Sequence, residues 1–113
     1  MELKHFCLQY YEWVEEIKNI RLYGRAGMSE VKSSDLPDPT FDISQRLIVF
    51  ELRMRMVEDA CMMTDEALAP YLFEAVTKDL TFPYFEAKGA PFGRDLFYDR
   101  LHKFFYILSQ IRM

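Results

Sequence analysis

Residues 41–62 read FDISQRLIVFELRMRMVEDACM, and apolar side chains recur there at alternating intervals of four and three. This spacing lines one face of an α-helix over nearly three heptads. The face consists of Ile43, Leu47, Phe50, Met54, Val57 and Cys61. Two interpretations follow from it. The helix packs against another helix of the same chain, or it forms a homodimer through Ile43, Leu47, Phe50, Met54 and Val57.

The segments on either side of this helix are also expected to be helical. Residues 1–23 carry apolar side chains at intervals of three and four, which predicts an amphipathic N-terminal helix. Residues 24–40 lose that periodicity and contain Gly, Ser and Pro, which predicts an irregular loop. A further helix is expected over 64–79, with Thr64 as its N-cap. The chain of 113 residues therefore predicts one all-α domain, a small bundle of about five helices.

Several functional classes find no support in the sequence. Charged residues interrupt every stretch of about 18 residues, so no membrane span is expected, and the first residues lack a signal-peptide pattern. Cys7 and Cys61 lie far apart without metal-ligand or disulfide spacing, which predicts buried thiols in a reducing cytoplasm. His5 and His102 belong to no nucleophile motif. We therefore expect no enzyme activity, no metal and no cofactor.

The last segment, residues 81–112, has the organisation of a helix-turn-helix. A short helix is expected over 81–87, with Thr81 as its cap and Pro83 in its first turn. Residues 88–93 contain two Gly and one Pro, which predicts a tight turn. A longer helix is expected over 94–112. In a helix-turn-helix the second helix enters the DNA major groove by its N-terminal turns.

Polar and basic side chains near the start of the last helix are the candidate DNA contacts. If Phe97, Leu101 and Phe104 turn inward, the opposite side of that helix faces outward. Arg94 and Tyr98 are then placed to contact bases. The full candidate set is Lys88, Arg94, Tyr98, Arg100, His102 and Lys103, of which Lys88, Arg100 and Lys103 are expected to hold phosphates.

Charge is distributed unevenly along the chain. Residues 88–113 contain five basic and two acidic residues, a net +3, whereas the first 87 contain nine basic and 16 acidic residues, a net −7. A basic C-terminal element on an acidic body is compatible with a polyanion partner. The alternative is a pair of core helices with arginines for solubility, which Asp95 and Asp99 favour because both would face DNA phosphates.

The run PFGRDLFYDRLHKFFYIL, residues 91–108, resembles the C-terminal segment of small Firmicutes phage and prophage proteins similar to the ArpU/RinA-type phage transcriptional regulators. Residues 68–79, LAPYLFEAVTKD, resemble the helix that these proteins place just before it. The resemblance covers roughly residues 43–112. Where the family tends to have a run of arginines, this chain has Arg100, Leu101, His102 and Lys103.

The resemblance implies a transcriptional regulator in the cytoplasm of a bacterial host that binds double-stranded DNA through a C-terminal helix-turn-helix. Arg94, Tyr98, Arg100 and Lys103 match the polar and basic positions of the family's second helix. The alternative is a phage-encoded, anti-CRISPR-like inhibitor without DNA binding of its own, whose acidic body occupies the positive channel of a basic host nucleic-acid enzyme. A structural or assembly protein of a phage is a third hypothesis.

Overall fold

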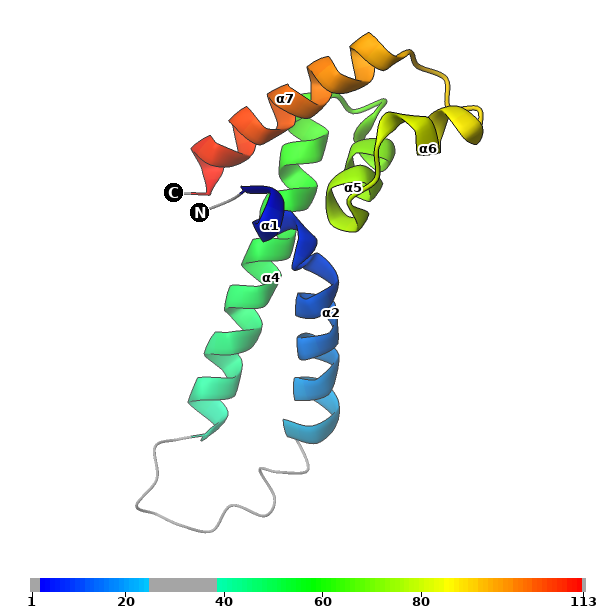
Figure 1. Cartoon of the computed structure of the whole chain (residues 1–113). Helices are drawn as coiled ribbons and strands as arrows, with labels where there is room; N and C mark the ends of the chain where they lie inside the picture. Colours follow the sequence, from blue (N-terminus) through cyan, green and yellow to red (C-terminus); the bar gives the residue numbers. More distant parts are fainter. Residues whose placement is uncertain (1–2, 25–38, 113) are drawn as a thin grey trace.

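The computed structural model describes residues 3–24 and 39–112, and their regular structure is entirely helical (Figure 1). The elements are α1 (Leu3–Leu8), α2 (Tyr10–Asn19), the π-helical turn η1 (Ile20–Gly24), α4 (Pro39–Thr64), α5 (Ala69–Lys78), α6 (Phe82–Ala87) and α7 (Arg94–Ile111). The prediction of a small all-α bundle is confirmed. Among these helices, none is both long and apolar enough to cross a membrane.

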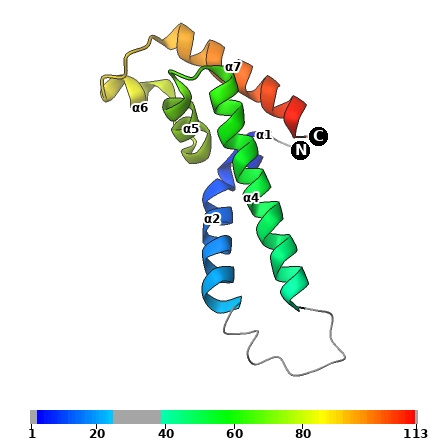
Figure 2. The same ribbon diagram turned by 180° about the vertical axis from the view of Figure 1, so that it is seen from behind.

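Helix α4 and helix α2 lie side by side and run antiparallel (Figures 1 and 2). Val57 and Cys61 of the predicted heptad stripe are buried, and Phe50 and Met54 pack against the same core. Leu47 is half-buried, and the side chain of Ile43 lies outside the described residues. The stripe therefore serves packing within one chain. The homodimer predicted through it stays untested, although Val57 has no surface left to offer a second copy.

The predicted N-terminal helix is interrupted at Gln9, where the amide of Gln9 bonds the carbonyl of Phe6 at 3.3 Å. The interruption separates two packing tasks, because α1 contacts α5 and α7 whereas α2 contacts α4. It also brings the rings of Phe6 and Trp13 edge to face, with centroids 4.9 Å apart. Helical structure then continues to Gly24, while residues 25–38 of the predicted loop lie outside the described part of the chain.

The boundary between α4 and α5 differs from the prediction. Thr64 is the last residue of α4 rather than an N-cap, and its hydroxyl donates to the carbonyl of Ala60 at 2.7 Å. The carboxylate of Asp65 instead accepts the amides of Ala67 and Leu68, at 3.1 and 3.3 Å. Helix α5 begins only at Ala69, because Pro70 fits the first turn of a helix but not its interior.

The main core forms where α7 crosses the C-terminal end of α4 (Figure 1). Phe104 and Leu108 of α7, Leu72 of α5 and Val57 of α4 are all fully buried there. α1 closes this core from the other side through Phe6 and Cys7. The orientation of α7 is therefore determined by apolar burial along its C-terminal half.

We expect Val57→Ala to lower the free energy of unfolding by about 2 kcal/mol, because it leaves a cavity in a fully packed site. Val49→Ala on the same helix is the matched control, since Val49 is 42% exposed, and its effect should stay within about 0.5 kcal/mol. Urea unfolding followed by circular dichroism measures both. Equal effects of the two substitutions would contradict the packing described for α4.

Candidate nucleic-acid interface

An aromatic cluster holds α6 against the first turns of α7. Phe97 of α7 is fully buried, and its ring centroid lies 5.5 Å from that of Phe85 on α6. Phe92, in the turn between the helices, stacks on Phe97 at 5.7 Å. Phe82 packs on Phe97 as well, and Tyr71 of α5 packs edge to face on Phe92. Because rings from both helices and from the turn meet at Phe97, these three segments form one rigid unit.

The turn itself ends α6 in a defined way. The amide of Ala90 donates to the carbonyl of Phe85 at 3.0 Å, and the amide of Gly89 donates to the carbonyl of Glu86 at 3.0 Å. These two bonds form a Schellman motif, which requires a left-handed residue after the helix. Gly89 supplies it with φ of +74°. The predicted helix-turn-helix organisation therefore has a structural counterpart, with α7 beginning at Arg94 as expected.

Two of the predicted contact residues extend from the start of this unit. Lys88 is exposed in the turn, with its ammonium 4.7 Å from the centre of the Tyr84 ring. Arg94 is exposed at the first position of α7, and its guanidinium carbon lies 5.4 Å from the centre of the Tyr98 ring. Each cation is thus supported by a neighbouring aromatic face without being neutralised.

Tyr98 has a different environment from the one predicted for a base contact. Its ring is half-buried and packs against the aromatic cluster. Its hydroxyl accepts the backbone amide of Phe82 at 3.5 Å, at the start of α6. The side chain therefore links the two helices and supports Arg94, which is a positioning role.

Arg100 does not point freely to solvent. Its Nε donates to Oδ2 of Asp65 at 2.8 Å, and its Nη1 donates to the carboxylate of Asp99. The hydrogen bond from Arg100 holds the pKa of Asp65 below its usual value, and the same bond raises the pKa of Arg100. This pair joins α7 to the connection between α4 and α5. The sequence predicts a phosphate contact for Arg100, whereas in the structure its guanidinium binds carboxylates of the same chain. Asp65 lies 35 residues away from Arg100 along the chain.

His102 and Lys103 lie on the exposed side of α7, together with Asp95 and Asp99. None of the ion pairs found in residues 3–24 and 39–112 involves Lys88, Arg94 or Lys103. The structure thus leaves these three cations accessible, whereas Arg100 and Tyr98 are engaged within the chain. Within the same residues, no three His, Cys, Asp or Glu side chains come together in a way that could hold a metal ion.

No family model, curated protein or solved structure matches this chain. The resemblance of residues 43–112 to phage regulators therefore stays a prediction from the sequence.

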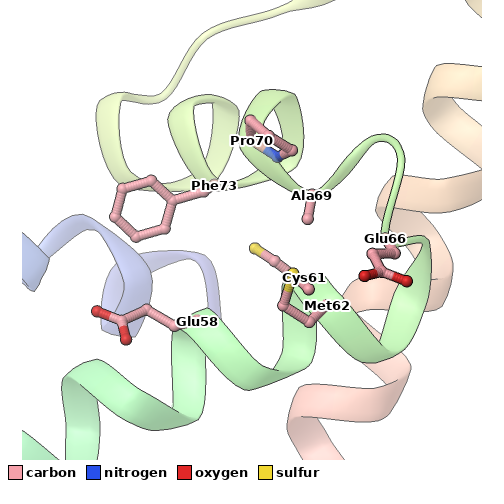
Figure 3. Close-up of a pocket in the computed structure, with 7 residues that line it drawn as sticks. All are labelled: Glu58, Cys61, Met62, Glu66, Ala69, Pro70 and Phe73. Atoms are coloured by element: carbon pink, nitrogen blue, oxygen red, sulfur yellow. The ribbon is translucent and has the colours of Figure 1, made fainter.

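A hollow of about 330 Å³ between α4 and α5 was not anticipated from the sequence (Figure 3). Its apolar wall includes Cys61 and Phe73, and the carboxylates of Glu58 and Glu66 lie at its rim. Glu58 accepts a hydrogen bond from the hydroxyl of Tyr10 at 2.5 Å, and burial together with this bond raises the pKa of Tyr10. Burial also raises the pKa of the Cys61 thiol to about 12, so it is not a nucleophile at neutral pH.

We expect Gly89→Ala to lower the free energy of unfolding by about 1 kcal/mol, because a side chain disfavours positive φ. Space is not the cause, since nothing lies within 4 Å of the added Cβ. Gly89→Asn should cost less, because Asn tolerates the left-handed region. Denaturant unfolding of the three proteins measures this order, and an Asn variant less stable than the Ala variant would contradict it.

The pair between Asp65 and Arg100 predicts a pH-dependent stability. The pKa of Asp65 is depressed in the folded state, so its contribution is present above the unfolded value of about 4 and disappears as the pH falls below it. Asp65→Asn should therefore lower the melting temperature at pH 7 and have little effect at pH 2. Glu86→Gln, an exposed acid on α6, is the control. A pH-independent difference would contradict the ionic role of Asp65.

Proposed function

We propose that this protein is a phage- or prophage-type transcriptional regulator that binds double-stranded DNA through α6, the turn 88–93 and α7. The observation that supports this most is the packing of α6 on the inner side of α7 around Phe97, with the basic residues at the start of α7 left exposed. A rigid helix pair with an accessible leading end is the arrangement that inserts a helix into the major groove. The resemblance of residues 91–108 agrees with this proposal.

The proposed contacts differ from those expected from the sequence alone. Arg94 is the base or guanine-edge contact, because it stands at the first position of α7. Lys88 and Lys103 hold phosphates on either side, and His102 lies between them on the exposed face. Tyr98 and Arg100 support the unit through their bonds to Phe82 and Asp65.

Acidic residues on the same face limit the expected affinity. Asp99 is partly neutralised by Arg100, but Asp95 has no cationic partner within residues 39–112. Asp95 stabilises the first turn of α7, where a negative charge favours the helix dipole. Close to a phosphate it would repel DNA. The proposal therefore includes a binding affinity that Asp95 reduces.

The test is a fluorescence-anisotropy titration of duplex fragments from phage genomes at two salt concentrations. Arg94→Ala combined with Lys103→Ala should weaken binding about tenfold or more and reduce the salt slope by roughly 0.9 for each phosphate that the variant no longer neutralises. Asp95→Asn should strengthen binding. Lys18→Ala, on α2, removes an exposed charge outside the interface and should change neither quantity.

Folded protein that binds no duplex at low salt would contradict the proposal. The competing hypothesis from the sequence, an inhibitor that binds a basic host nucleic-acid enzyme, then becomes the one to test by titration with such an enzyme. Binding that the Arg94 and Lys103 variant leaves unchanged would place the DNA contact elsewhere on the chain.

A further inference from the structure

Helix α4 carries a second set of apolar side chains on the side opposite its buried stripe. Ile48, Leu52, Met62 and Met63 are 55%, 51%, 51% and 57% exposed. They follow one side of the helix for about four turns, because their spacing matches the helical repeat. Their exposed fractions mean that no other described helix covers these four side chains. Single exposed apolar residues are ordinary, but four on one side of a single helix are typical of a contact surface.

Two charged residues of opposite sign stand in the middle of this row. Arg55 and Asp59 are both exposed and lie one turn apart, between Leu52 on one side and Met62 on the other. Neither takes part in an ion pair within the described ranges 3–24 and 39–112. We define the outer face of α4 as Ile48, Leu52, Arg55, Asp59 and Met62. Its two ends are apolar and its centre carries one charge of each sign.

This order is self-complementary when the helix meets a copy of itself running in the opposite direction. With the two-fold axis at the level of residue 57, Arg55 of each chain stands opposite Asp59 of the other. Leu52 then stands opposite Met62 in the same way. A two-fold interface needs one surface that matches itself, and opposite charges across it favour this register over a parallel one, where Arg55 would meet Arg55. We propose that a second copy of this chain binds antiparallel along the outer face of α4.

The register also brings Ile48 close to the hollow between α4 and α5. Continuing the pairing outward from residue 57 brings Ile48 of one chain to the level of Glu66 of the other. Glu66 and Met62 line the hollow in Figure 3, together with the apolar surfaces of Pro70 and Phe73. Ile48 of each chain therefore stands near the rim of this hollow in the other chain.

The outer face extends over 14 residue steps, or about 21 Å of helix. Such a length buries less than a standard interface of roughly 800 Å² per partner, so the dimer is expected to be weak, with a dissociation constant on the order of micromolar. This inference is independent of DNA binding.

Sedimentation equilibrium over a range of protein concentrations tests the dimer. Wild-type protein should show a concentration-dependent dimer, and Arg55→Asp should weaken it at least tenfold because acids then face acids across the interface. The double variant Arg55→Asp with Asp59→Arg should restore it, since the opposite charges face each other again. Arg53→Asp is the matched charge reversal on the same helix but off the outer face, and it should leave the dimer unchanged. Wild-type protein that stays monomeric at about 100 µM, or a double variant that stays dissociated, would overturn the proposal.

Oxidative cross-linking tests the direction of the two helices. Leu52→Cys combined with Met62→Cys should give a covalent dimer, whereas Leu52→Cys alone should not. In the antiparallel register the two copies of residue 52 lie ten residues apart, about 15 Å, which exceeds the reach of a disulfide. The native thiols of Cys7 and Cys61 are buried and do not interfere. Efficient cross-linking of Leu52→Cys alone would overturn the antiparallel arrangement.

Discussion

Helix α4 determines the arrangement of this protein because it carries apolar residues on two sides. The rest of the chain covers only one of these sides. Its 26 residues span about 39 Å, and α2, α5 and α7 pack on the side that contains Val57 and Cys61, where Phe6 and Cys7 of α1 join the same core. α1, α5 and α7 gather at its C-terminal end, whereas α2 and η1 lie along the remainder (Figure 1). The opposite side stays exposed even though it carries Ile48 and Leu52. The geometry of both proposed interfaces follows from this one-sided burial.

Two apolar clusters divide the molecule into a main core and the unit formed by α6 and the start of α7. The larger cluster anchors the C-terminal half of α7 through Phe104 and Leu108, and the smaller one joins α6 to its N-terminal half through Phe97. The ion pair of Arg100 with Asp65 lies between these halves and connects α7 to the end of α4. In the proposed DNA complex, a recognition helix held at both levels would lose little conformational entropy on binding. The packing of α7, as well as its charge, therefore supports that proposal.

Local patterns in the sequence predict the helices well, and they fail where another local bond or a contact between distant residues competes with the pattern. The intervals of Ile43 to Cys61 and the Gly and Pro residues of 88–93 determine α4 and the turn before α7 by local rules. Thr64 satisfies the same local rule for an N-cap, but its hydroxyl bonds within α4 instead. No Gly or Pro marks the break at Gln9 in the sequence. The break instead accompanies the packing of α1 on α5 and α7. Arg100 looks like a free cation in the sequence, since Asp65 is 35 residues away.

The two proposals, although independent, combine in a way that bears on affinity. In the proposed DNA complex, Asp95 beside Arg94 would weaken a single contact, and a few lysines would offer only a few phosphate contacts. An antiparallel dimer through α4 would carry one α6–α7 unit near each end of the paired helices, because α7 crosses the C-terminal end of α4 (Figure 1). Two linked weak sites bind a two-fold-symmetric DNA sequence more tightly than either alone, since the second contact forms at high effective concentration. Symmetry would thus compensate for the acids, and discrimination among DNA sequences would come from the spacing of two half-sites as much as from Arg94.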